Sequence, residues 1–163
     1  MTEILLRRPA HLVSRRARAF WTVRALVGWL VIGAVETAGL TPGGVPAAVR
    51  WSIVAPTAVV AALHLMVMPQ WRYRVHRWEI TDTAVYTQAG WFSQERRLAP
   101  IARVQTVDTK RGPLEQLFGL ANVTVTTASA RGPLQIDALD RATADHTVAW
   151  LTERAQASGG DGT

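Results

Sequence analysis

Two long apolar segments, residues 20–40 and 51–68, constrain this 163-residue chain more than any other feature. An α-helix rises 1.5 Å per residue, so about 20 residues cross the ~30 Å hydrocarbon core of a bilayer. Both segments approach that length, and helices of soluble cores rarely stay apolar on every face. The residues between them include turn formers that prevent a continuous helix, namely Pro42, Gly43, Gly44 and Pro46. The sequence therefore predicts a transmembrane helical hairpin over residues 20–69, preceded by a basic arm, residues 1–19.

Arginine residues predict the orientation of this hairpin. Six arginines lie in residues 1–24 and three follow the second segment, whereas the connecting loop has only Arg50. Because Lys and Arg near membrane ends stay in the cytoplasm, we expect a multi-pass protein of the cytoplasmic membrane with both termini inside. We expect six of them to contact anionic lipid headgroups and to orient the protein without selecting one lipid: Arg15, Arg16, Arg18, Arg72, Arg74 and Arg77.

The N-terminus has one alternative interpretation. Residues 14–20 loosely resemble a twin-arginine export signal, and cleavage after export would place the remaining chain outside. The apolar run is long for such a signal, and a second apolar run follows it. Both observations favour the hairpin.

Two ionisable residues, Glu36 and His64, lie inside the apolar segments. Intramembrane ionisable groups often have functional roles. Both are expected close to an interface, so the sequence leaves their roles open.

Charge and composition exclude several classes of function. The net charge of +6 lies mainly in the arm, because residues 1–24 contribute +5 and residues 71–163 only +1. Nucleic acid is therefore not an expected partner. The absence of cysteine excludes disulfides, thiolate metal sites and a cysteine nucleophile. The four histidines are scattered and no common catalytic or nucleotide-binding motif is present, so we expect neither an enzyme nor a cofactor or metal site.

After Gln70 the hydrophobic periodicity changes to two, which is typical of strands. Strands are predicted over residues 73–80, 84–89, 93–98, 104–110, 122–127 and 134–139, with a short turn or helix at 114–118. Residues 141–157 have the pattern of an amphipathic helix, and the Gly-rich tail, residues 158–163, is predicted to be disordered. Residues 70–157 are therefore predicted to form one domain, an antiparallel curved sheet or partial barrel closed by the C-terminal α-helix.

Five short stretches occur in an order that carries a family resemblance: residues 79–82 (EITD), 90–92 (GWF), 98–105 (LAPIARVQ), 112–120 (GPLEQLFGL) and 123–127 (VTVTT). This order resembles the bacterial pleckstrin-homology domains of the YdbS-like, DUF304 (bPH2) type. That family also tends to have a two-helix membrane hairpin before the domain, so the resemblance covers nearly the whole chain. It implies a bacterial membrane protein with two packed antiparallel sheets and a C-terminal helix, and it implies no defined activity or ligand.

Two hypotheses for the function remain. The first is a membrane-anchored interaction or assembly module that uses a strand edge or helix face to bind an unknown membrane protein or a second copy. The second is a module that binds lipid headgroups or the membrane surface. Near-neutral charge of the domain favours the first, and basic loops favour the second. The candidate contacts in the loops are Arg96, Arg97, Lys110, Arg111 and Arg131. Arg103 is the one polar position of the family stretches with no evident folding role, and we expect it to form an ion pair with Asp108 or Glu115.

Overall fold

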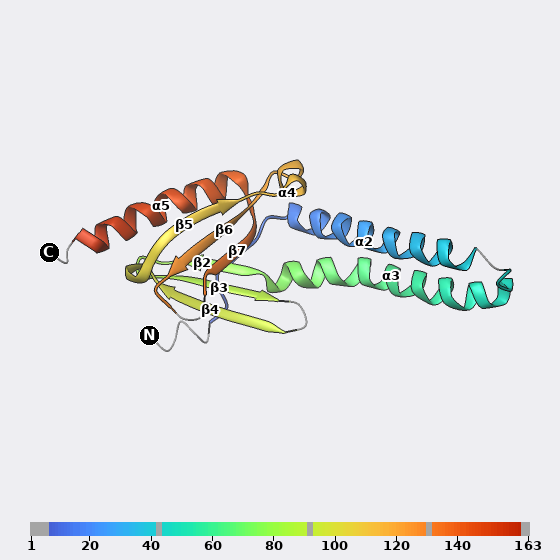
Figure 1. The fold of residues 1–163 in the computed structure, drawn as a ribbon. Coiled ribbons are helices and arrows are strands. Elements are labelled where there is room, and N and C mark those ends of the chain that lie inside the picture. The colour runs from blue at the N-terminus through green and yellow to red at the C-terminus, as the bar shows by residue number, and fades with distance from the viewer. Residues whose placement is uncertain (1–6, 42–43, 91–92, 130–131, 161–163) are drawn as a thin grey trace. The chain divides into compact units, whose positions relative to one another are not determined.

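The computed structural model describes residues 7–41, 44–90, 93–129 and 132–160 (Figure 1). The chain divides into two compact units. The helical unit is Arg18–Gln70, and the β unit combines Met1–Ala17 with Trp71–Thr163. The β unit therefore draws on chain segments from both sides of the apolar region.

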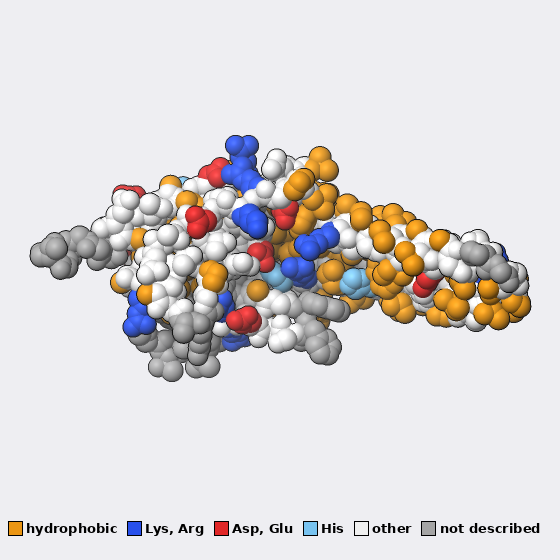
Figure 2. Space-filling view, in the orientation of Figure 1, with side chains coloured by type: hydrophobic (Ala, Val, Ile, Leu, Met, Phe, Trp, Pro, Cys, Tyr) orange, Lys and Arg blue, Asp and Glu red, His pale blue; other side chains and the backbone are white. Residues whose placement is uncertain are grey.

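Helices α2 (Arg16–Leu40) and α3 (Ala47–Val75) make up the predicted apolar region. Both are long and apolar enough to cross a membrane, and hydrophobic side chains cover much of their surface in Figure 2. The two predicted helices are confirmed, although each begins earlier than the apolar segment that predicted it. Pro56 and Pro69 lie inside α3, which continues beyond the predicted end at residue 68.

Polar contacts that involve the two ionisable residues of the apolar segments join α2 to α3 inside the helical unit. The indole N–H of Trp29 donates to Nδ1 of His64 at 2.9 Å. The hydroxyl of Thr57 donates to Oε1 of Glu36 at 2.8 Å. Hydrogen bonds between membrane helices contribute on average about 0.6 kcal/mol each. Glu36 and His64 thus each have a partner on the facing helix.

The β unit contains two antiparallel sheets. The first has the order β1-β2-β3-β4 and the second β5-β6-β7. The strands of the first sheet are β1 (His11–Leu12), β2 (Arg77–Ile80), β3 (Ala84–Gly90) and β4 (Gln94–Pro100). Those of the second are β5 (Val104–Lys110), β6 (Leu120–Thr127) and β7 (Leu134–Asp140). The remaining elements are η1 (Ile101–Arg103), α4 (Pro113–Leu117) and α5 (Arg141–Gly160).

The core of the β unit lies where α5 packs against the second sheet and where residues of the first sheet join them. Its most buried aliphatic side chains are Val85, Val123, Val125, Leu139 and Leu151. The alternation predicted for residues 122–127 and 134–139 is confirmed, since the inward residues of both strands are buried. The fold of two antiparallel sheets and a C-terminal helix, predicted from the sequence, is therefore correct.

Several predicted boundaries differ from the observed elements. The strand predicted to begin at Tyr73 begins at Arg77, because α3 continues to Val75. Arg72 and Arg74 are basic residues in the last turn of that helix, where they interact favourably with its dipole. Arg74 is therefore helical and does not belong to the strand predicted from residue 73.

The two ends of the chain also differ from their predicted boundaries. Helix α5 extends to Gly160, beyond the predicted end of the domain at residue 157 and into the predicted disordered tail. Residues 161–163 of that tail lie outside the described residues. At the other end, residues 1–17 group with the β unit, so the arm is not separate from the predicted domain of residues 70–157.

Candidate functional site

The first part of the arm is fixed to the sheet by Glu79 of β2. Its carboxylate, 12% exposed, forms an ion pair with Arg7 and accepts a hydrogen bond from the backbone N–H of Ala10 at 2.9 Å. The hydroxyl of Tyr86 donates to the backbone carbonyl of Arg7 at 2.8 Å. Strand β1 then pairs with β2 through His11 and Leu12. Residues 7–12 of the arm are therefore a folded part of the β unit.

The second part of the arm is fixed by Ser14. Its backbone N–H donates to the carbonyl of Ala138 at 3.0 Å, and its hydroxyl donates to Oδ1 of Asp140 at 2.8 Å. Ala138 has a φ of 55°, which is uncommon for a residue other than glycine. Its backbone N–H is held by the side-chain oxygen of Asn122 at 2.8 Å. The backbone N–H and carbonyl of Ala138 are thus both hydrogen-bonded, and these contacts hold its strained conformation where the arm meets β7.

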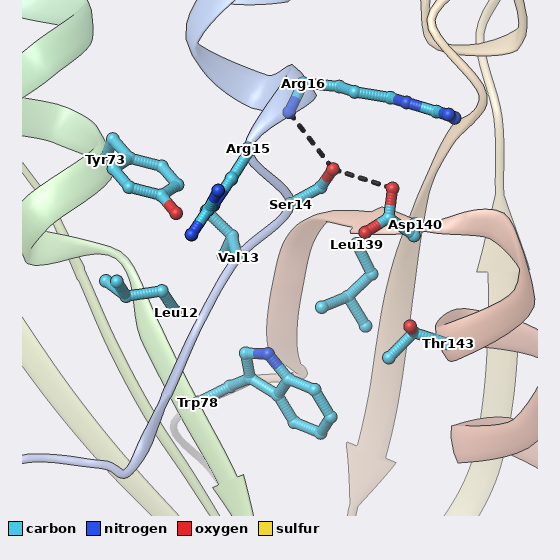
Figure 3. Close-up of a pocket in the computed structure, with 10 residues that line it drawn as sticks. All are labelled: Leu12, Val13, Ser14, Arg15, Arg16, Tyr73, Trp78, Leu139, Asp140 and Thr143. Carbon is cyan, nitrogen blue, oxygen red and sulfur yellow. Dashed lines mark hydrogen bonds between the residues drawn. The ribbon is translucent and has the colours of Figure 1, made fainter.

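The arm forms part of the wall of an open pocket of about 470 Å³, which we call the arm pocket (Figure 3). All of its lining residues belong to the β unit. They are Leu12, Val13, Ser14, Arg15, Arg16, Tyr73, Trp78, Leu139, Asp140 and Thr143.

The arm pocket contains polar groups without partners. The indole N–H of Trp78 is buried and makes no hydrogen bond. Leaving such a donor unsatisfied costs roughly 1–3 kcal/mol. Arg15 is exposed and forms no ion pair with any described residue. The pocket therefore has hydrogen-bond donors that a ligand could use.

A second concave surface, the β4 groove, has a volume of about 320 Å³. Strand β4 is the outer strand of its sheet and pairs with β3. The groove is lined by Glu95, Arg96, Arg97, Leu98, Ala99, Pro100, Arg103, Thr127, Ser129, Gly132 and Leu134.

Arginine residues dominate the charge of the β4 groove. Arg97 donates to the backbone carbonyls of Pro133 at 2.6 Å and Gly132 at 3.0 Å, so it fixes β4 to the turn before β7. Its Nε lies 3.6 Å from the carboxylate of Glu95. Arg96 and Arg103 are exposed, and within the described ranges neither has an ion-pair partner. These two unpaired guanidinium groups make the groove suitable for an acidic ligand.

The five predicted loop contacts do not form one cluster. Arg96 and Arg97 lie in the β4 groove, and Lys110 is exposed at the end of β5. Arg111 is neutralised by Asp145 of α5 at 2.7 Å. Arg131 lies outside the described residues.

Sequence reasoning missed Arg103 as a member of the groove. It forms no ion pair with Asp108 or Glu115, the partners that the sequence suggested. Its position directly after the LAPIA stretch, where no folding role was evident, was the signal that could have identified it.

The six arginines predicted to contact lipid have different surroundings. Arg15, Arg16 and Arg74 are exposed. The other three donate hydrogen bonds inside the chain: Arg18 to the side chain of Gln70 at 3.4 Å, Arg72 to His76 at 3.5 Å and Arg77 to the carbonyl of Pro9 at 3.4 Å. Lipid contact by this group stays a prediction, and its exposed members are the ones available for it.

His76, just after α3, is a buried titratable residue of the β unit. Burial lowers its pKa below the usual value, and the positive charge of Arg72 lowers it further. Its Nδ1–H donates to the carbonyl of Arg72 at 2.8 Å, while Nε2 accepts from the Arg72 guanidinium. These contacts fit a neutral imidazole.

A metal centre finds no support in the described residues, where no three His, Asp or Glu side chains gather in a way that could hold an ion. What the β unit offers instead is two binding surfaces, the arm pocket and the β4 groove.

Comparison with known proteins agrees with this architecture. Residues 22–155 match the family described as "Bacterial PH domain". A 65-residue stretch is 37% identical to the UPF0699 transmembrane protein YdbS of Bacillus subtilis (strain 168), covering 40% of this chain and 41% of that protein. No solved structure matches significantly. The family match extends over most of the chain and includes most of α2, all of α3 and strands β2 to β7, and the chain therefore belongs to the bacterial PH domain family.

Proposed function

We propose that this protein is a membrane-anchored, non-enzymatic interaction module whose β4 groove binds an acidic, extended segment of a membrane-protein partner. The observation that carries the proposal is the outer strand β4 beside two unpaired guanidinium groups, those of Arg96 and Arg103. An extended segment can add to the edge of a sheet, where backbone hydrogen bonds supply affinity and side-chain contacts supply specificity.

The charges of the groove favour an acidic partner. Glu95 and Arg97 lie near each other, and Arg97 is also held by two backbone carbonyls. Arg96 and Arg103 therefore remain for the partner. Exposed ion pairs contribute only about 0.2–1 kcal/mol each, so we expect them to select the sequence and register of the added strand more than to supply its affinity.

The membrane helices support a role beside the bilayer. Two long apolar helices separate the arm from the rest of the β unit, yet both parts fold together. If both helices cross the membrane, the two parts lie on the same side of it. The arginines near the helix ends favour the cytoplasmic side.

Site-specific photo-crosslinking in cells that express the full chain tests this proposal. A photoreactive residue at Gln94 of β4 is expected to form a protein adduct, whereas the same group at Gln135, an exposed position of β7, is not. The double variant Arg96→Glu/Arg103→Glu should lose the adduct, and Lys110→Glu should keep it. An adduct that survives the double reversal would contradict the proposal. An adduct of twice the chain mass would identify a second copy as the partner.

The alternative function is binding of anionic lipid headgroups by the same unpaired guanidinium groups. Their exposure and positive charge favour it as well. Under this alternative, mass spectrometry would find lipid adducts at Gln94 and no protein adduct, and the double reversal would remove the lipid adducts.

A further inference from the structure

We propose that the arm pocket is a binding site for a small phosphate ester that carries a hydroxyl group near the phosphate. Glycerol phosphate, free or as the headgroup of a phospholipid, has this chemistry. The arm pocket and the β4 groove share no lining residue, so this site is independent of the proposed interaction surface.

The positive charges of the pocket favour an anion. Arg15 and Arg16 line it and Asp140 is the one carboxylate among its lining residues. Arg15 has no ion-pair partner within the described ranges. Helices α2 and α5, of 25 and 20 residues, begin at or beside the lining residues, and helix N-termini carry partial positive charge. A phosphate group near Arg15 is therefore favoured electrostatically.

Asp140 requires that the ligand also donate a hydrogen bond. Its Oδ1 accepts from the hydroxyl of Ser14, and Oδ2 accepts no hydrogen bond from the described residues. An ionised carboxylate can only accept, so the ligand group placed against Oδ2 has to donate a hydrogen bond. A hydroxyl group on the ligand would satisfy Oδ2, and Thr143 beside it can donate or accept. The acid thus favours an ester whose hydroxyl can reach Oδ2 while its phosphate stays near Arg15, on the other side of the pocket (Figure 3).

The remaining walls fit the carbon atoms of such an ester. Leu12, Leu139 and the ring of Trp78 supply apolar surface. The unsatisfied indole N–H of Trp78 would gain an acceptor, directly or through an ordered water. Figure 3 shows Arg15 and Tyr73 on one side of the pocket and Asp140 and Thr143 on the other. The volume of about 470 Å³ lies in the usual range for small-molecule sites.

Nuclear magnetic resonance of the full chain in phosphatidylcholine nanodiscs tests the proposal. Tryptophan indoles are labelled with ¹⁵N, and the Trp78 resonance is assigned with the variant Trp78→Phe. Glycerol 1-phosphate is expected to shift this resonance saturably and to bind about tenfold more tightly than inorganic phosphate, which has no hydroxyl group apart from the phosphate itself. A separate sample contains phosphatidylglycerol in the nanodisc. A saturable shift from the lipid alone identifies the headgroup as the source, and one from the soluble ester alone identifies a free ester.

Two variants test whether the ligand binds in the arm pocket. Arg15→Gln should weaken binding about tenfold or more, because a charge-assisted hydrogen bond is lost. Arg15 is exposed, so this change should leave the fold intact. Arg96→Gln, in the β4 groove, should bind normally, which separates this proposal from the proposed interaction surface. Equal affinity of Arg15→Gln and the unmodified chain, equal affinity for phosphate and its glycerol ester, or no saturable shift from either source would overturn the proposal.

Discussion

At the scale of single residues, His76 makes the stability of the β unit depend on pH. Its pKa is lowered in the folded chain, mainly by burial and then by Arg72, and is partly restored by a hydrogen bond to the Arg72 carbonyl and by the charge of Asp137. The unfolded chain, with an ordinary histidine pKa near 6.5, binds the proton first as the pH falls. Stability is therefore expected to decrease as the pH drops below about 6.5.

The variant His76→Gln checks this prediction, because glutamine does not titrate in that range. Thermal melts of the purified full chain between about pH 7.5 and 5 should show a smaller loss of Tm for the variant than for the unmodified chain. His146→Gln, at an exposed position, is the matched control and should keep the full loss. Identical pH profiles for His76→Gln and the unmodified chain would disprove the role of His76.

At the scale of elements, the arm depends on Glu79. Glu79→Ala removes the partner of Arg7 and the acceptor for the N–H of Ala10. Because this carboxylate is mostly buried, we expect a loss of about 1–3 kcal/mol in stability and faster tryptic cleavage after Arg15 and Arg16.

The control for Glu79→Ala is the variant Glu95→Ala. The side chain of Glu95 is 73% exposed and pairs only loosely with Arg97, so its loss should have little effect on stability or cleavage. Cleavage rates in the arm and melting temperatures of both variants, measured in the same detergent, provide the comparison. Equal behaviour of the two variants would mean that Glu79 does not hold the arm.

Periodicity predicted most elements of the β unit, because each strand carries its own signal. Val123 and Val125 alternate with threonines and are buried, and a register shift between Val104 and Thr106 accommodates the odd spacing of Val104 and Val107. The short helix at 113–117 is followed by Gly119, whose φ of 65° is a backbone conformation that glycine adopts readily. Local pattern and local structure agree at these positions.

Sequence periodicity did not predict the structure where it depends on contacts between residues that are distant in the chain. Strand β1 has two residues, His11 and Leu12, and a pair of residues has no period to detect. Leu117 and Leu120 belong to the same motif, and the local sequence does not distinguish them, yet Leu117 is 79% exposed whereas Leu120 is buried.

The candidate site was predicted in part for the same reason. Arg96 and Arg97 were identified from their charge, and both line the β4 groove. Sequence could not show that Arg111 is neutralised by Asp145, since the two are far apart in the chain. The arm pocket was not predicted at all, because it exists only when the arm packs beside β2 and the start of α5.

At the scale of the whole molecule, the β unit restricts how the chain crosses a membrane. Because the arm and the residues after α3 form one unit, we expect both to lie on the same side of a membrane that α2 and α3 cross. We expect the loop between α2 and α3 to be outside and α5 to be in the cytoplasm. The chain has no cysteine, so single cysteines can report on this.

Thr41→Cys and Gln156→Cys provide the measurement. An impermeant thiol reagent added to intact cells should label the first and not the second, and permeabilised cells should show labelling of both. Gln156 is exposed on α5, so lack of labelling cannot result from burial. Labelling of Gln156→Cys in intact cells would contradict the predicted orientation and would support the export interpretation instead.

Pairing of β1 with β2 also has a consequence for the order of events during synthesis. Leu12 leaves the ribosome long before its partner Arg77, because both apolar helices are made in between. At about 5–20 residues per second this delay lasts several seconds. Throughout that time the arm has no sheet to join, and the β unit can close only after the hairpin has been translated. A chain whose hairpin inserts in the wrong way would keep its two halves apart and expose the edge of β2, which gives quality-control proteases a marker of failed insertion.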